Sequence, residues 1–115
     1  MMEYKRGDIV LVNFNPQKKS EEISKIRPAI IISDTQLNEI LDLVSVIALT
    51  TNLIDDAEPL RIRISKKEYL KQDSDAMVEQ LRSVSKSRIG EKIASLDENE
   101  LLKIEYGIKA MLALN

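Results

Sequence analysis

The stretch that decides the fold runs from residue 25 to residue 33 and reads Lys25-Ile26-Arg27-Pro28-Ala29-Ile30-Ile31-Ile32-Ser33. An unbroken apolar run after a proline is typical of a strand that is buried on both faces and lies centrally in a sheet. Pro28 pushes Arg27 out of helical geometry into an extended one. A guanidinium presents five donors in a rigid fork that suits a phosphate group. Arg27 is therefore either a phosphate-binding residue or an ordinary surface arginine beside a strand.

Further strands are predicted on both sides of this segment. Residues 8–14 are β-branched and apolar, and their alternation places Phe14 with the core rather than on the surface as a stacking platform. A short helix or turn is expected over residues 34–41. Additional strands are expected over 43–51, 60–64, 76–78 and 81–84, and a turn over 85–90.

The C-terminal residues carry the clearest helix signal. Asp97 can cap this helix, and Glu100, three residues later, completes a capping box. The apolar residues that follow recur at helical spacing and are Leu101, Ile104, Ile108, Met111 and Leu112. Gly107 destabilises a helix by about 1 kcal/mol relative to alanine, which points to close packing at this position. The expected architecture is a single domain over residues 1–115, a small and strongly bent antiparallel β-barrel closed by a C-terminal helix.

Composition narrows the chemistry. The chain has 115 residues, of which 43% are apolar and 31% are charged, as in an ordinary globular domain. It contains no cysteine and no histidine, so thiol catalysis, disulfides and the commonest metal ligands are excluded, and neither a metal nor another cofactor is expected. Any catalysis must use Asp, Glu, Arg, Lys, Tyr, Ser or Thr. No run is long enough to span a bilayer and no signal-peptide core follows the N-terminus, so a cytoplasmic protein is expected.

The distribution of charge is more informative than the net charge of −2. Residues 29–60 contain no basic residue, and their six acidic residues are Asp34, Glu39, Asp42, Asp55, Asp56 and Glu58. Lysines and arginines gather instead at residues 18–27, 61–71 and 82–92. This pattern suits a fold with a basic groove on one side and an acidic surface on another, although solvated faces of no special function would produce it equally well.

Several short motifs now fall into a recognisable order. They are Lys5-Arg6-Gly7-Asp8, Arg27-Pro28, Ala48-Leu49-Thr50-Thr51, Asp73-Ser74, Glu79-Gln80-Leu81-Arg82-Ser83-Val84 and Lys86-Ser87-Arg88-Ile89. In this order and at these spacings the chain resembles the MazF/PemK family, the toxin components of bacterial and archaeal toxin–antitoxin pairs. The resemblance extends from about residue 5 to the final helix. It implies an SH3-like barrel that dimerises and cleaves single-stranded RNA at preferred short sequences.

The resemblance also implies site residues. The central catalytic pair of the family maps onto Arg27 and Thr50. Cleavage of RNA by its own 2′-hydroxyl needs a proton acceptor, donors for the charge on the phosphorane, and a proton source for the leaving 5′-oxygen. Arg27 can neutralise the phosphate oxygens, Thr50 can donate a hydrogen bond to them, and without histidine a carboxylate, either Glu21 or Glu22, is the expected base.

A second set of residues is expected to bind the RNA strand. Strand alternation predicts that Gln80 and Arg82 share one face, where Gln80 can contact base edges and Arg82 a phosphate or a base. Arg82 could instead belong to an ion-pair network with Asp73 or Asp75. The full set of expected RNA-binding residues is Ser20, Lys25, Thr51, Gln80, Arg82, Lys86 and Arg88.

The chain departs from the family pattern at two places. Many members carry glycines in the loop before Arg-Pro, whereas residues 18–25 contain none here, which leaves the assignment of Glu21 against Glu22 open. Some relatives also carry a proton-donating arginine at the position of Met77. Its absence shifts the donor role to Arg27.

The expected partners follow from the resemblance and from the chemistry. They are single-stranded RNA, a cognate antitoxin whose acidic tail competes with phosphates for the basic groove, and a second copy of the chain; no membrane is expected, and DNA only through the antitoxin. Two alternatives are a non-catalytic SH3-like binding module, such as a topoisomerase-directed toxin, and a degenerate dimer partner without activity.

Overall fold

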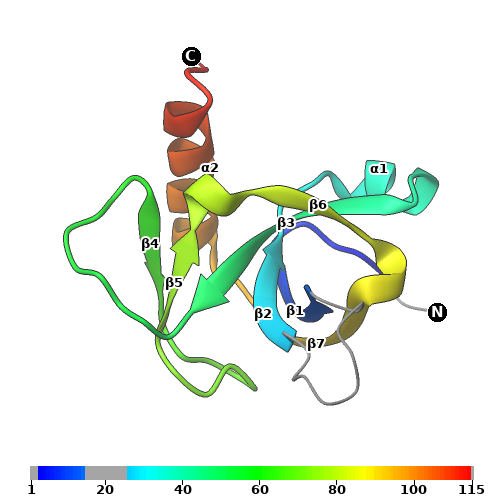
Figure 1. The fold of residues 1–115 in the computed structure, drawn as a ribbon, viewed down its shortest axis with the longest axis horizontal. Coiled ribbons are helices and arrows are strands. Elements are labelled where there is room, and N and C mark those ends of the chain that lie inside the picture. Colours follow the sequence, from blue (N-terminus) through cyan, green and yellow to red (C-terminus); the bar gives the residue numbers. More distant parts are fainter. Residues whose placement is uncertain (1–2, 15–25, 115) are drawn as a thin grey trace.

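The computed structural model describes residues 3–14 and 26–114. These residues form strands and helices that are distributed along the whole described chain (Figure 1). In chain order the elements are β1 (Asp8–Asn13), β2 (Ile26–Ile31), α1 (Thr35–Ile40), β3 (Leu43–Thr50), β4 (Arg61–Ile64), β5 (Ser74–Met77), the 3-10 helix η1 (Val78–Gln80), β6 (Arg82–Ser85), the 3-10 helix η2 (Lys86–Arg88), β7 (Ile89–Ser95) and α2 (Glu98–Met111).

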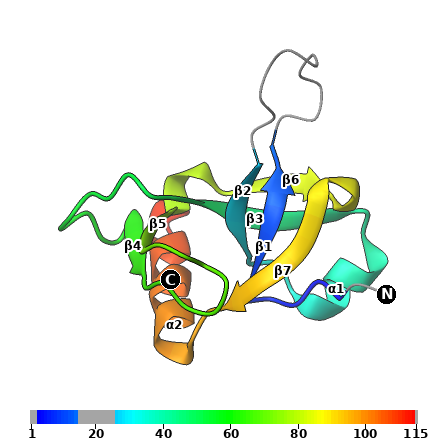
Figure 2. The same ribbon diagram turned by 90° about the horizontal axis from the view of Figure 1, so that it is seen from below.

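The strands pair antiparallel in the order β4-β5-β3-β2-β1-β7, and β6 pairs with β3 beside this path. β3 is the longest strand and links two regions, because it pairs with β6 along its first half and with β5 at its end. The strands β7-β1-β2-β3-β6 curl into a barrel (Figure 2). Among the described residues no ladder joins β6 to β7, so the barrel is open at that seam. The predicted bent antiparallel barrel with a C-terminal helix is otherwise confirmed.

Two apolar clusters lie on opposite faces of the sheet. The first lies between the sheet and α2 and includes Ile30, Ile47, Leu49, Ile62 and Ile104. The second fills the inside of the barrel and consists of Val10, Val12, Ala29, Ile31, Val44, Val46 and Val84, with Phe14 packed against it. Successive residues of a strand therefore belong alternately to the first and the second cluster. The face on which a polar strand residue lies can be inferred from the cluster to which the residues two positions away belong.

Helix α2 forms as its sequence predicts. The side chain of Asp97 accepts a hydrogen bond from the backbone N–H of Glu100, and the side chain of Glu100 accepts one from that of Asp97. α2 packs on β4 and η1. A Cβ atom at Gly107 would lie 2.5 Å from the carbonyl oxygen of Pro59 and 3.3 Å from Val78. The expected close packing at Gly107 is confirmed.

Two local expectations were wrong. β7 was not predicted, because Gly90, Glu91 and Lys92 interrupt its apolar pattern; it nevertheless pairs with β1 across a ladder with two register shifts. Gln80 does not lie in a strand with Arg82 but ends the 3-10 helix η1, so strand alternation cannot place it. In the described part of the chain no helix is both long enough and apolar enough to cross a membrane.

Candidate functional site

Arg27 and Thr50 lie two residues beyond the end of the ladder that joins β2 to β3. β2 and β3 pair through Ala29 with Ala48, Ile30 with Ile47 and Ile31 with Val46. The same register, continued by two residues, brings Arg27 opposite Thr50. Both residues are half-buried. By this extrapolated register, two residues more than 20 positions apart in the sequence fall at neighbouring ends of β2 and β3.

The same two residues project from one face of the sheet. Arg27 alternates with Ala29 and Ile31, and Thr50 alternates with Val46, so both side chains lie on the face of the second apolar cluster. Thr50 Oγ1 accepts a hydrogen bond of 3.2 Å from the backbone N–H of Asn52. Within residues 3–14 and 26–114, the Arg27 side chain forms no ion pair and no hydrogen bond. Its donors are available to a ligand.

Arg82 approaches this face from β6. Its guanidinium carbon lies 5.3 Å from the centre of the Phe14 ring, a cation–π contact. Phe14 is half-buried against the second cluster, as the sequence predicted. The Arg82 guanidinium lies over its ring. The contact with the ring positions the Arg82 guanidinium, and because Arg82 is exposed, its N–H donors can still bind a ligand. The alternative ion pair of Arg82 with Asp73 or Asp75 is not formed.

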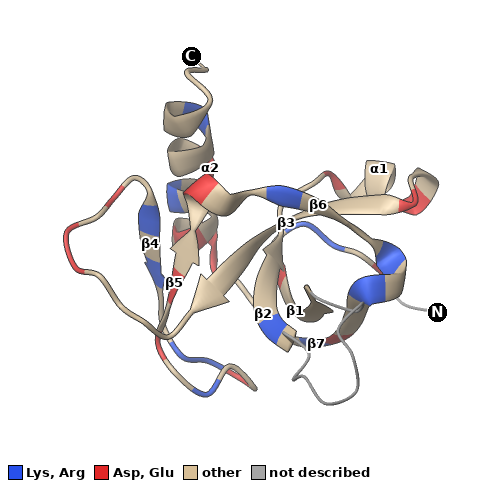
Figure 3. Ribbon diagram, in the orientation of Figure 1, with Lys and Arg blue, Asp and Glu red and all other residues tan. Residues whose placement is uncertain are grey.

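The remaining basic residues continue around the barrel. Lys86 and Arg88 lie in η2, and the Lys86 ammonium is 5.2 Å from the centre of the Tyr4 ring. Figure 3 shows basic segments on β2, β6 and η2 around the barrel and acidic segments on the loop between β3 and β4. The two charges are not fully separated, because Arg63 of β4 pairs with Asp55 of this loop at 2.8 Å. The expected basic groove stays a prediction.

Asp75 organises the neighbouring strands, a role that sequence reasoning missed. It pairs with Thr50 across β3 and β5, and its side chain is 1% exposed. Its carboxylate accepts hydrogen bonds of 2.6 Å from Arg63 Nε and 2.8 Å from the backbone N–H of Ile54. The bonds from Arg63 to Asp75 and Asp55 raise the pKa of that guanidinium above its ordinary value. Arg63 is therefore a permanent structural cation.

Of the other predicted site residues, some lie in the described part of the chain and some lie outside it. Thr51 and Gln80 are exposed, Thr51 directly after β3 and Gln80 at the end of η1. Met77 is buried and pairs with Arg61 of β4. The predicted residues Ser20, Glu21, Glu22 and Lys25 lie outside the described residues.

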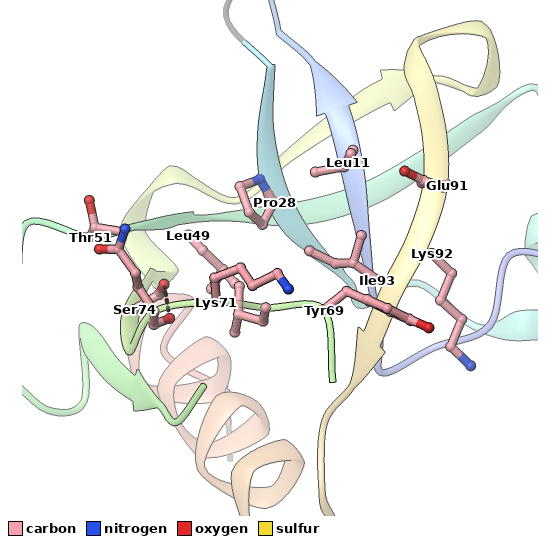
Figure 4. A pocket seen from close by; sticks show the side chains of 12 residues that line it. Leu11, Pro28, Leu49, Thr51, Tyr69, Lys71, Ser74, Glu91, Lys92 and Ile93 are labelled. Carbon is pink, nitrogen blue, oxygen red and sulfur yellow. Dashed lines mark hydrogen bonds between the residues drawn. The ribbon is translucent and has the colours of Figure 1, made fainter. Parts of the chain in front are cut away.

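A pocket of about 720 Å³ opens on the other face of the sheet (Figure 4). Apolar side chains of Leu11, Pro28, Leu49 and Ile93 form its floor. Polar side chains of the segment between β4 and β5, together with those of β7 and Thr51, form its rim. Pro28 and Thr51 directly follow Arg27 and Thr50 in the chain, so the pocket adjoins the strand ends that carry the pair.

No group of three or more acidic residues in the described part of the chain is arranged to hold a metal ion. The donors that strand alternation assigns to the face of the second cluster are cationic and hydroxylic. Such a set can bind a phosphodiester and stabilise additional negative charge on it.

Comparison with known proteins places this geometry in context. Residues 5–112 match the family model described as PemK-like, MazF-like toxin of type II toxin–antitoxin system. The chain is 32% identical over 112 residues to the endoribonuclease MazF of Staphylococcus epidermidis, and the alignment covers 96% of this chain and 92% of that protein.

Solved structures share the fold. The crystal structure of MazF from Deinococcus radiodurans superposes with a TM-score of 0.79 at 21% identity, over 99% of this chain and 100% of that one. The MazE–MazF complex of the same organism gives a TM-score of 0.80 at 19% identity, with coverage of 96% and 97%. The toxin MazF-mt6 of Mycobacterium tuberculosis gives 0.78 at 17% identity, with coverage of 94% and 98%.

Proposed function

Because the chain belongs to the PemK-like, MazF-like toxin family of type II toxin–antitoxin systems, we propose that it is an endoribonuclease toxin. Its proposed substrate is single-stranded RNA, which it cleaves at preferred short sequences without a metal ion. The observation that carries the proposal is the β2–β3 register, which sets Arg27 opposite Thr50 when it is continued by two residues beyond the pair of Ala29 and Ala48. An arginine without a protein partner among the described residues, next to a hydroxyl on a shared sheet face, is suited to a phosphodiester.

The proposed reaction starts with attack of the 2′-hydroxyl oxygen on the adjacent phosphorus. A bond forms between these atoms, and the hydroxyl proton passes to a carboxylate, for which we assign Glu21 or Glu22. Negative charge grows on the non-bridging oxygens, where Arg27 and Thr50 donate hydrogen bonds. The bond from phosphorus to the 5′-oxygen then breaks, and Arg27 supplies the proton to the departing oxygen, because Met77 offers none. The products are a 2′,3′-cyclic phosphate and a 5′-hydroxyl.

The RNA strand is proposed to follow the basic residues around the barrel. Arg82, held over Phe14, contacts a phosphate or a base, and Lys86 and Arg88 contact phosphates further along. Gln80 and Thr51 are exposed and are proposed to contact bases. Ser20 and Lys25 complete the proposed set.

The proposed partners are an antitoxin and a second copy of the chain. Complexes of MazE with MazF are among the structures that share this fold, and an acidic antitoxin segment would compete with phosphates for Arg27 and Arg82. Exposed apolar side chains on and after α2 support self-association through this helix, namely Leu102, Tyr106, Leu112 and Leu114. The proposed compartment is the cytoplasm, where messenger RNA is available.

The test is incubation of antitoxin-free protein with single-stranded RNA in EDTA, followed by analysis of the fragment ends. We expect cleavage that is unaffected by the chelator, 5′-hydroxyl and 2′,3′-cyclic phosphate ends, and recurrent short sequences at the cut. Sequencing of the 5′ ends then defines the preferred sequence.

Two results would contradict the proposal. Intact RNA after prolonged incubation with folded protein would exclude the activity. Toxicity on expression that persists in Arg27→Ala and Thr50→Ala variants, with no RNA decay, would point to a non-catalytic binding module instead.

A further inference from the structure

The exposed ring of Tyr69 stands on the rim of the 720 Å³ pocket described above. We infer that this pocket holds a nucleobase of the RNA strand next to the cleaved phosphate, with Tyr69 as its stacking platform. The inference rests on the proposed function, since it names a subsite of the same strand.

Tyr69 is an exposed aromatic residue on a fixed backbone. Its side chain is 71% exposed, whereas its backbone N–H donates a 3.0 Å hydrogen bond to the carbonyl oxygen of Ile93 in β7. The flanking residues are also anchored. Leu70 is 5% exposed in the first apolar cluster, and the Glu68 carboxylate accepts a 3.0 Å hydrogen bond from the backbone N–H of Ser95. An ordered backbone presents the ring at a defined position, which lowers the entropy lost when a ligand binds.

The pocket has the surfaces that an unstacked base requires. Its floor is formed by aliphatic side chains and Pro28, against which the flat faces of a base can lie. On the rim, the carboxylate of Glu91 can accept hydrogen bonds from base edges, and the amide of Gln72 can both accept and donate them. Recognition of single-stranded RNA commonly combines stacking on an aromatic ring with hydrogen bonds to such edges. A volume of about 720 Å³ is sufficient for one nucleoside.

The positive charge on the rim of the pocket, and the position of the pocket next to Arg27 and Thr50, favour RNA as the occupant over an apolar side chain of a protein partner. Lys71 and Lys92 lie on the rim on either side of Tyr69 (Figure 4). Lys92 pairs with Asp8 at 3.4 Å, so Lys71 is the cation available to a phosphate that flanks a bound base. Pro28 belongs to the floor and directly follows Arg27, and Thr51 belongs to the rim and directly follows Thr50. Because neighbouring strand residues point to opposite faces, an RNA strand whose scissile phosphate is held by Arg27 and Thr50 reaches the pocket by passing around the ends of β2 and β3.

The experiment measures binding separately from cleavage. A fluorescently labelled, randomised pool of short single-stranded RNA, with every 2′-hydroxyl replaced by fluorine, cannot undergo the proposed attack. Its affinity is measured by anisotropy for the wild-type chain, for Tyr69→Ala, and for Tyr69→Phe, which keeps the ring. Ile40→Ala, which removes an equally exposed apolar side chain from α1, is the matched control. We expect Tyr69→Ala to weaken binding by about 5- to 100-fold, and the other two variants to stay within about twofold of the wild type.

A second arm assigns the base. In an oligonucleotide that contains the cleaved sequence, a single abasic nucleotide is moved through the positions flanking the cut. At one position the loss in wild-type affinity should match that of Tyr69→Ala, and the same abasic nucleotide should cause no further loss in the Tyr69→Ala variant.

The outcomes separate the two proposals. Equal affinity of the wild type and Tyr69→Ala, or no binding of the pool at all, overturns the inference whether or not the chain cleaves RNA. Tyr69-dependent binding without cleavage of ordinary RNA would overturn the proposed function and leave the subsite standing. If Tyr69→Ala weakens self-association in sedimentation experiments but not RNA affinity, the pocket serves a protein contact and the inference is wrong.

Discussion

Thr50 and Asp75 are paired across β3 and β5, and the Asp75 carboxylate is buried between Arg63 and the backbone of Ile54. The proposed phosphate-binding hydroxyl therefore stands next to a carboxylate whose lone pairs are already engaged. This arrangement keeps the negative charge of Asp75 from repelling a phosphate and ties the end of β3 to the loop that follows it.

Asp75→Asn should destabilise the chain by about 1–3 kcal/mol, because it removes the charge from hydrogen bonds that are charge-assisted in the wild type. The free energy of unfolding in urea measures the effect. Asp56→Asn is the control, since Asp56 is exposed in the neighbouring loop with a φ of 56°, which asparagine tolerates, and it should change stability by less than about 0.5 kcal/mol. Equal urea midpoints for the two variants would show that Asp75 does not organise this region.

Arg82→Gln should weaken RNA binding, because it removes one cation that the Phe14 ring holds in place. On single-stranded RNA, the slope of log affinity against log salt should become shallower by about 0.7, the value for one phosphate contact. Lys103→Gln makes the same change of charge on α2, where Lys103 pairs with Glu58, and should leave the slope as it is. An unchanged slope in the Arg82 variant would remove this residue from the RNA path.

Gly107→Ala should destabilise the chain although alanine is the better helix former. The added Cβ would lie 2.5 Å from the Pro59 carbonyl oxygen, and relief of this overlap should cost about 1–3 kcal/mol. This cost should exceed the stabilisation of about 1 kcal/mol that alanine gives over glycine in a helix. At Gly90 the nearest atom to an added Cβ is 3.5 Å away, so Gly90→Ala should change the midpoint of thermal unfolding far less. A more stable Gly107→Ala protein would contradict the close approach of α2 to residues 57–60.

Asp97→Ala should lower the free energy of unfolding by about 1 kcal/mol, because one N–H in the first turn of α2 loses its acceptor. Glu98 lies in the same turn but does not cap it, so Glu98→Ala should have an effect of only a few tenths of a kcal/mol. Chemical denaturation of both variants under identical conditions distinguishes capping from a simple loss of negative charge.

Local signals were sufficient for much of this fold. The capping box at Asp97 and Glu100 and the apolar periodicity after it define α2 without reference to the rest of the chain. The apolar run after Pro28 likewise defines β2 as a central strand. β7 could not be recognised in the same way, because its pairing with β1 compensates for a weak strand pattern around Gly90.

Only the site residues at the ends of predicted strands could be identified from the sequence. Arg27 and Thr50 were identified from motif order, and they come opposite each other when the β2–β3 register is continued by two residues. Asp75 was considered only as an ion-pair partner of Arg82, because its burial arises from pairing with β3 and β4. Tyr69 was missed, because its exposure arises from the contact of its segment with β7. Gln80 was assigned to a strand, because nothing in the sequence distinguishes a short 3-10 turn from the start of β6.

The most direct test of the central claim is the single-turnover rate of RNA cleavage by Arg27→Ala in EDTA, compared with the wild type and with Arg88→Ala. Circular dichroism and thermal unfolding verify that each variant is folded. If Arg27 stabilises the charge on the phosphorane, its loss should slow cleavage by about 100- to 1,000-fold or more, whereas loss of a phosphate contact at Arg88 should mainly weaken binding. An Arg27→Ala protein that cleaves RNA within about twofold of the wild-type rate would contradict the assignment of Arg27 to the catalytic centre, since twofold corresponds to only about 0.4 kcal/mol.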